Sequence, residues 1–269
     1  MGILYMEKHN LDIKDNVLDE KNYTYSNETN LLLKDKIVAY YNGLNWKIVP
    51  LDIFLSYPVI YDKYYNEDSN GKRVTIAVCP FTLVTSMFEG EYYPSEYLLN
   101  SSLILTNKQN YLLPIVSGFS NDPNGGINKV KRWEVSIKTL RNAISDYPDC
   151  QFLNLTESPI KKVINDDYYY NSNLLFKVTN MTKDKIHPKT LVYVIQYKSS
   201  KTLNDKYSII VGKDANTLEP SGYNIKDSGL LKYIEKMEFK LREKSAFLLP
   251  ILWFACGNLF PNAKIIKLN

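Results

Sequence analysis

The residue best suited to covalent chemistry is Cys79, which Pro80 follows at once in the stretch Arg73–Glu89 (RVTIAVCPFTLVTSMFE). A cysteine acts as a nucleophile only as its thiolate, so a base or a positive charge must lower its pKa. If Cys79 lies in a cleft, Asp62 and Asn100 are the polar residues we expect beside it. These three would then be the catalytic residues of a hydrolase or transferase.

A partner base for this thiol is hard to find in the sequence. The chain has two histidines, His9 and His187, and only the fold could bring His187 to Cys79. Asp166 and Asp167 form a carboxylate pair, but they lie in a predicted loop, where solvation is the default. The alternative is that Cys79 is a small buried hydrophobe, which is the commonest state of a free cysteine.

Cysteine usage argues against metal and disulfide chemistry. The three cysteines, Cys79, Cys150 and Cys256, are odd in number and widely spaced. No histidine lies at a metal-ligand spacing, and Asn124-Gly125-Gly126 lacks the continuation of a phosphate-binding loop. We therefore expect no metal and no cofactor, and a reducing, intracellular compartment.

The tyrosines are the other group with a chemical use. The chain holds 22 of them, and Tyr168–Tyr170, with Tyr61, Tyr64 and Tyr65, could form an aromatic recognition surface. In a composition so rich in tyrosine, ordinary half-buried side chains are the competing interpretation. A net charge of +4, with the basic cluster Lys129–Arg132 standing alone, argues against a nucleic-acid partner.

Apolar patterning indicates the elements that would position these residues. Val74, Ile76 and Val78 form one face of a strand that should break at Pro80. Asn42-Gly43 predicts a hairpin turn. The other predicted strands are Lys36–Tyr41, Trp46–Val49, Tyr57–Tyr65, Tyr97–Thr106, Tyr111–Val116, Val130–Val135, Cys150–Leu155, Leu191–Tyr197, Tyr207–Gly212, Glu238–Arg242 and Lys264–Leu268.

Helical signals are short. Pro50 begins a helical turn, and Leu230–Ile234 predicts another. Ser136 stands at an N-cap position before a stripe of Ile137, Leu140 and Ile144. Ala246–Leu259 predicts the most hydrophobic helix, too short to cross a bilayer.

Both longer helices end at an aromatic residue followed by proline, in Tyr147-Pro148-Asp149 and Phe260-Pro261-Asn262. This echo predicts an α+β fold, mainly antiparallel β-sheet with short helices, in which two pseudo-repeated halves pack as one body. Chance recurrence of a common stop signal is the alternative. The predicted divisions are a polar arm (1–30), a first half (31–155), a connecting segment (156–188) and a second half (189–269). The N-terminus lacks the features of a secretory signal, and we expect no membrane span.

Five short motifs, in order, resemble the family named domain of unknown function 3179, whose hallmark is a YCPLC-type strand. The hallmark is similar to Val78–Thr82, and a Y-P-L segment upstream is similar to Val49-Pro50-Leu51. Its N-S-x-L strand, its W…hPD segment and its closing aromatic segment resemble Leu99–Leu103, Trp133–Asp149 and Leu252–Pro261. The resemblance spans most of residues 36–268 and implies a shared fold, with no agreed activity.

Departures from the family pattern bear on function. Where family members carry W-H-E-I-V-N-D, this chain has Tyr57 and Pro58 at the His and Glu places, and Asp62 persists. Thr82 replaces the second hallmark cysteine. The groups suited to acid–base catalysis are therefore missing. We expect a non-catalytic, soluble structural or interaction protein that binds a protein partner or itself, with Tyr57, Thr82, Ser101, Tyr168 and Tyr169 as binding residues.

Overall fold

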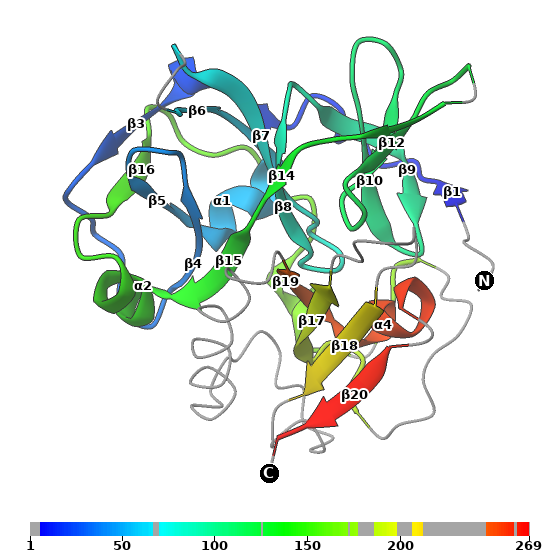
Figure 1. The fold of residues 1–269 in the computed structure, drawn as a ribbon. Helices are drawn as coiled ribbons and strands as arrows, with labels where there is room; N and C mark the ends of the chain where they lie inside the picture. Colours follow the sequence, from blue (N-terminus) through cyan, green and yellow to red (C-terminus); the bar gives the residue numbers. More distant parts are fainter. Residues whose placement is uncertain are drawn as a thin grey trace.

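The computed structural model describes residues 6–66, 70–124, 126–171, 173–176, 186–197, 206–211, 246–260 and 263–268. Within these residues the chain is mostly β-sheet, and four small sheets lie in a propeller-like ring (Figure 1). The prediction of an α+β fold with two repeated halves is therefore wrong. The helical segments are each one or two turns long, so they connect strands and do not form a layer.

Strands far apart in the sequence meet in each sheet. Sheet A has the order β1-β9-β10-β11-β12-β13, and all its pairs are antiparallel. Its strands are β1 (Met6–Lys8), β9 (Tyr93–Leu99), β10 (Ser102–Thr106), β11 (Leu112–Pro114), β12 (Phe119–Asn121) and β13 (Ile127–Lys129). Sheet B has the order β14-β8-β7-β6-β2. Its strands are β14 (Arg132–Trp133), β8 (Thr85–Glu89), β7 (Lys72–Val78), β6 (Val59–Tyr64) and β2 (Val17–Leu18).

The other two sheets include the parallel pairs β5–β16 and β18–β20. Sheet C has the order β15-β4-β5-β16-β3, with β15 (Val135–Thr139), β4 (Lys36–Tyr41), β5 (Trp46–Pro50), β16 (Gln151–Leu155) and β3 (Tyr23–Ser26). Sheet D has the order β19-β17-β18-β20, with β19 (Ala246–Leu252), β17 (Leu191–Tyr197), β18 (Lys206–Val211) and β20 (Lys264–Lys267). The helical segments are η1 (Glu20–Asn22), α1 (Leu51–Ser56), α2 (Leu140–Asp146), η2 (Asp166–Tyr169) and α4 (Trp253–Leu259).

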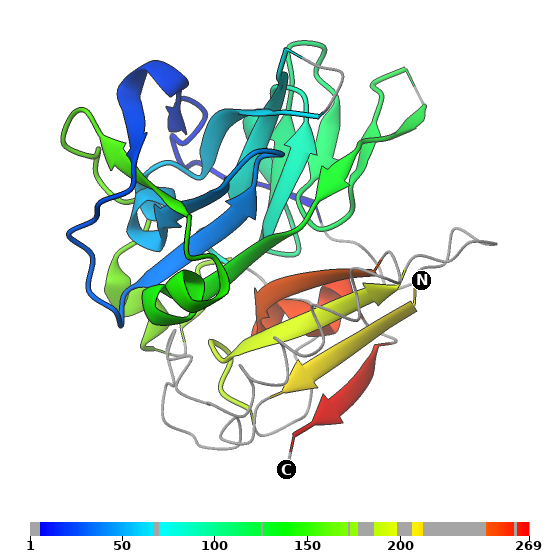
Figure 2. The same cartoon turned by 60° about the vertical axis from the view of Figure 1, so that its left-hand side comes forward.

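Sheets C and D share one topology. In each, an antiparallel hairpin (β4–β5 or β17–β18) receives an antiparallel strand on its first member (β15 or β19). A short helix (α2 or α4) then leads to a strand parallel to the second member (β16 or β20). Figure 2 shows sheet D at the bottom of the molecule, with β17, β18 and β20 side by side.

Three helices also end in the same way. Tyr57, Tyr147 and Phe260 follow α1, α2 and α4, and each backbone N–H donates to the carbonyl four residues earlier. Proline follows each aromatic residue in the sequence. Because proline disfavours helical backbone in the residue before it, the aromatic residue becomes the end of each helix.

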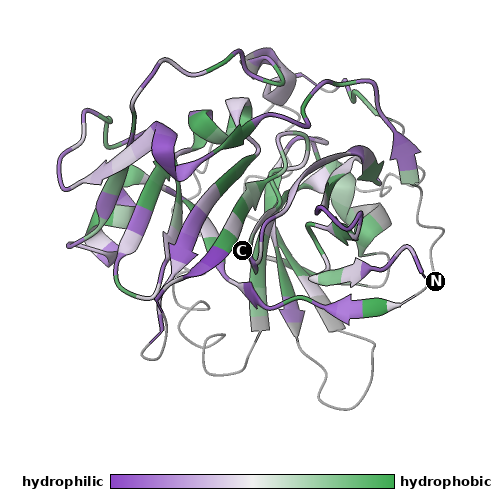
Figure 3. Ribbon diagram, turned by 90° about the horizontal axis from the view of Figure 1, so that it is seen from above, coloured by the Kyte–Doolittle hydropathy of each residue, from purple (hydrophilic) through white to green (hydrophobic). Residues whose placement is uncertain are grey.

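One hydrophobic core draws residues from all four sheets, and a smaller one lies between sheet C and α2. Figure 3 shows hydrophobic segments mostly on strands and short helices, with hydrophilic residues in the connecting loops. Hydrogen bonds also join the sheets: Thr85 Oγ1 donates to the Val135 carbonyl (2.9 Å), and the Tyr193 hydroxyl donates to the Ile137 carbonyl (3.2 Å). No helix among the described residues has the length and apolar character needed to cross a membrane.

Several local predictions are wrong in their boundaries. Ala246–Leu252 is strand β19, and only the following residues are helical. A short run buried on every side has no periodicity that separates strand from helix. Pro250 is tolerated because β19 is an edge strand. The N-cap of α2 is Thr139, whose side chain accepts from the backbone N–H of Asn142, while Ser136 lies within β15.

The predicted strand Tyr97–Thr106 is in fact two strands. Asn100 and Ser101 have φ values of 47° and 67°, and this left-handed pair makes the turn between β9 and β10. Asparagine adopts this conformation more readily than most residues. The predicted helical turn Leu230–Ile234 and strand Glu238–Arg242 lie outside the described residues. The polar arm 1–30 contributes β1, β2 and β3 to three sheets, and the domain divisions stay predictions.

Candidate functional site

The turn that follows β7 carries the predicted nucleophile. Cys79 has no exposed surface, and burial raises the pKa of its thiol. Its sulfur accepts a hydrogen bond from the backbone N–H of Leu103 (3.3 Å) and lies 3.9 Å from the Ser101 carbonyl oxygen. A catalytic cysteine needs access and a lowered pKa. This environment is that of a packed thiol.

Five predicted site residues do come together around this turn. Tyr168 and Tyr169, from η2, donate their hydroxyls to the carbonyls of Phe81 and Pro80. Thr82 Oγ1 lies 3.4 Å from Ser102 Oγ. The five residues, Cys79, Thr82, Ser101, Tyr168 and Tyr169, are each at most 7% exposed. The two tyrosines therefore fix the backbone of the turn and do not form an open recognition surface.

Lys189 completes this buried cluster, and no sequence pattern singles it out. It has no exposed surface, and its Nζ donates to the Tyr168 carbonyl (2.6 Å). Burial lowers its pKa to about 7. His187 is also buried, and its Nδ1 accepts from the backbone N–H of Lys189 (3.2 Å). These contacts tie the segment before sheet D to the turn after β7.

The remaining predicted residues are Asp62, Asn100 and Tyr57, and Asn100 is the neighbour of Ser101. Asp62 is buried on β6, where Tyr40 donates to its carboxylate and burial raises its pKa. Asn100 is buried in the β9–β10 turn. The Tyr57 hydroxyl accepts from the backbone N–H of Ile160 (3.2 Å). Within the described part of the chain, no three His, Cys, Asp or Glu side chains are grouped as metal ligands would be.

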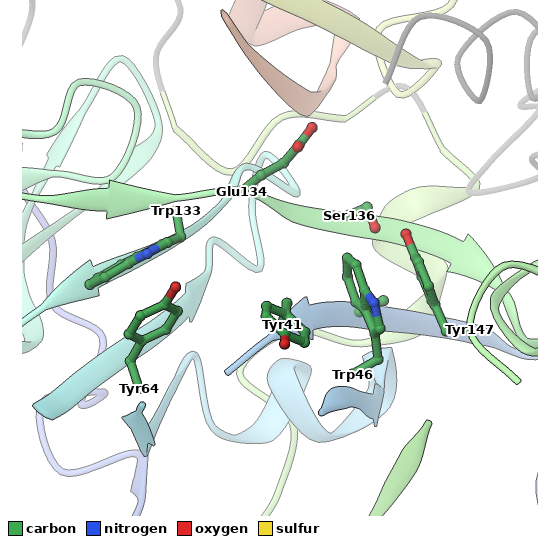
Figure 4. A pocket seen from close by; sticks show the side chains of 8 residues that line it. Tyr41, Trp46, Tyr64, Trp133, Glu134, Ser136 and Tyr147 are labelled. Carbon is green, nitrogen blue, oxygen red and sulfur yellow. The ribbon is translucent and has the colours of Figure 1, made fainter. Parts of the chain in front are cut away.

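An aromatic cleft of about 380 Å³ lies where sheets B and C meet. It is lined by five aromatic side chains with Ala39, Glu134 and Ser136; the aromatic residues are Tyr41, Trp46, Tyr64, Trp133 and Tyr147. Figure 4 shows Tyr64 and Trp133 at one end, Trp46 and Tyr147 at the other, and Tyr41 between them. This volume is within the range of small-molecule sites.

The two ends of the aromatic cleft are preorganised by ring contacts. Trp46 and Tyr147 are stacked, with centroids 3.6 Å apart and an interplanar angle of 13°. The ring centroids of Tyr64 and Trp133 lie 4.4 Å apart. Tyr147 is held at the end of α2, and Trp46 begins β5. Tyr41 remains 41% exposed between the pairs, so its ring is available to a ligand.

Charged groups border this cleft. The Nζ of Lys131 lies 4.8 Å from the ring centroid of Trp133 and 5.9 Å from that of Tyr64. At the other end, Lys138 Nζ lies 5.1 Å from the Tyr147 centroid and 2.7 Å from the Asp146 carboxylate. Glu134 contributes a carboxylate, and Figure 4 shows it directed away from the rings.

Among the aromatic lining residues, the sequence indicated only Tyr64 as a recognition residue, together with tyrosines that do not line the cleft. Trp46 and Trp133 carried a signal, because two of the chain's three tryptophans lie here. They line one cavity only because sheets B and C are in contact, and no local sequence pattern predicts that contact.

Comparison with known proteins adds no relative. No protein-family model, no curated protein and no solved structure matches the chain. The resemblance to the YCPLC-type family stays a prediction.

Proposed function

We propose that the protein is a non-catalytic binding protein whose ligand occupies the aromatic cleft. The observation that carries this proposal is the convergence on one cavity of five aromatic rings, four from sheets B and C and one from the end of α2. Large aromatic side chains bury much apolar area at low entropic cost, which is why they dominate recognition sites. The exposed surface of rings such as Tyr41 costs free energy that a bound ligand recovers.

The state of Cys79 supports the non-catalytic part of the proposal. A thiol that is fully buried, with a raised pKa, is poorly placed to attack a substrate. The tyrosine hydroxyls near it are engaged with backbone carbonyls. The polar groups of this cluster therefore serve the packing of sheet D against the turn.

Saturation-transfer NMR tests the proposal with three probe sets: neutral methyl glycosides, quaternary ammonium compounds and a short proline-rich peptide. We expect the wild-type protein to bind at least one set and to leave it chemically unchanged. Tyr41→Ala should weaken that binding, because the Tyr41 ring is exposed between the two aromatic pairs. Tyr170→Ala is the matched control, since Tyr170 is 54% exposed and lies outside the cleft.

Two results would contradict the proposal. One is that none of the probe sets binds. The other is binding that Tyr41→Ala and Trp133→Ala leave unaltered, which would place the ligand elsewhere. Unfolding curves of each variant would show that the loss of binding is not a loss of fold.

A further inference from the structure

We infer that the aromatic cleft takes a neutral sugar ring, either as a free saccharide or as the terminal residue of a glycan. This inference rests on the proposed function and names the chemical class of its ligand. A pyranose has apolar C–H faces and a hydroxyl-bearing edge. A binding site for it therefore needs aromatic rings against the C–H faces and hydrogen-bonding groups at the hydroxyl-bearing edge.

The aromatic cleft supplies both kinds of surface. The stacked pair Trp46–Tyr147 and the pair Tyr64–Trp133 present rings at its two ends. Ser136, within β15, adds a hydroxyl to its lining, and Glu134, just before β15, borders it with a carboxylate that is directed away from the rings. Figure 4 shows the hydroxyls of Tyr64 and Tyr147 directed toward the side on which Glu134 lies. The hydrogen-bonding groups therefore lie along one side of the aromatic cleft.

The charges around the cleft argue against an ionic ligand. A cationic ligand would favour aromatic faces. Lys138 near Tyr147 is paired with the Asp146 carboxylate, whereas the Lys131 ammonium already lies on the Trp133 ring. A second cation there would meet like charge. An anionic ligand would lie near the negative charge of Glu134, which borders the cleft although its carboxylate is directed away from the rings. A neutral ligand with many hydroxyls avoids both penalties.

The size of the cleft argues against an extended polymer lying along it. Its volume of about 380 Å³ is near the lower end of the range for small-molecule sites, roughly 300–1,000 Å³. A proline-rich peptide needs a groove that continues over several residues. One ring, with the remainder of a glycan outside, matches the space.

The test is a titration of the full chain with methyl glycosides of glucose, galactose, mannose and N-acetylglucosamine, up to about 20 mM. Tryptophan emission is the readout, since Trp46 and Trp133 line the cleft whereas Trp253 is buried. A glycan array separates a free saccharide from a terminal glycan residue. We expect saturable binding of at least one sugar, weakened about tenfold by Tyr41→Ala. Ser136→Ala should weaken it also, and Tyr170→Ala should leave it unchanged.

Outcomes separate this inference from the proposed function. Suppose that a quaternary ammonium compound binds in the cleft and no sugar binds. That result would overturn the inference of a sugar ligand, while the proposed binding function would stand. Absence of saturable sugar binding, in solution and on the array, would overturn the inference even if the peptide bound. Sugar binding that Tyr41→Ala and Ser136→Ala leave unaltered would also overturn it, because the sugar would then lie outside the cleft.

Discussion

Tyr40 donates its hydroxyl to the buried carboxylate of Asp62 across the junction of sheets C and B, at 2.6 Å. Tyr25 is hydrogen-bonded to the same Tyr40 oxygen, and the Lys47 ammonium lies 3.9 Å from the Tyr25 ring centroid. Burial raises the Asp62 pKa, and the bond from Tyr40 opposes that rise. One hydroxyl therefore links two tyrosines and a carboxylate where the sheets of the aromatic cleft meet.

Tyr40→Phe should destabilise the fold by roughly 1–3 kcal/mol, because it leaves a buried carboxylate and the Tyr25 hydroxyl each short of a partner. The neighbouring change Tyr41→Phe is the control, since the Tyr41 hydroxyl bonds the Gly43 carbonyl at an exposed position. It should cost less than ~0.5 kcal/mol. Urea unfolding measures both variants. Equal losses in the free energy of unfolding would show that the Tyr40–Asp62 hydrogen bond stabilises the fold no more than an exposed hydrogen bond does.

Stability should rise with pH above neutrality because of Lys189. Its pKa is about 7 in the folded protein and 10.5 as the ordinary value. Between these values the unfolded state binds more protons, so the free energy of unfolding increases with pH. Lys189→Met should flatten this rise. The measurement is urea unfolding from pH 7 to about 8, below the ordinary cysteine pKa of about 8.5, because burial raises the thiol pKa values and would lower stability at higher pH.

A second lysine provides the internal comparison for that experiment. Burial also lowers the Lys36 pKa to about 7, so Lys36→Met should remove another part of the rise. The double variant should be flatter than either single one. A slope that Lys189→Met leaves unchanged would mean that Lys189 keeps an ordinary pKa in the fold.

Local chemistry made part of this fold predictable. Asn42-Gly43 predicted its hairpin, because Gly43 takes a φ of +95° and Asn42 Oδ1 accepts from the backbone N–H groups of Leu44 and Asn45. Pro50 predicted α1, and Pro80 predicted the end of β7. Each of these signals depends on one or two residues whose backbone is restricted, so the surrounding fold does not alter it.

Other features depend on contacts that only the whole chain provides. The segment 248–252 is apolar throughout and buried, and pairing with β17 makes it a strand. The four-sheet ring required pairings such as β3 with β16 and β1 with β9, which join distant segments. The sequence did not predict the aromatic cleft for the same reason, since Trp46 and Trp133 line one cavity only through the contact of two sheets.

Gly43→Ala should be strongly destabilising. A Cβ at Gly43 would lie 1.7 Å from the Tyr65 carbonyl oxygen, and the backbone there has a positive φ. We expect a loss of more than ~1 kcal/mol in the free energy of unfolding. Gly126→Ala is the control, because its Cβ would meet the nearest atom at 3.5 Å. Thermal melts compare the two variants. Equal melting temperatures would contradict the prediction, because the Gly43 turn would then accommodate a Cβ without cost.

Native labelling with iodoacetamide should modify Cys150 first. Cys150 is 4% exposed and lines a cavity of about 360 Å³, whereas Cys79 and Cys256 have no exposed surface. Burial raises the pKa of all three thiols, so access decides between them, and Cys79 and Cys256 should react only on unfolding, slower by roughly 10³ or more. Cys150→Ala should remove the fast phase, as mass spectrometry of the labelled peptides would show. Faster labelling of Cys79 than of Cys150 would mean that this sulfur is open to solvent and activated, and it would return the case for a catalytic cysteine.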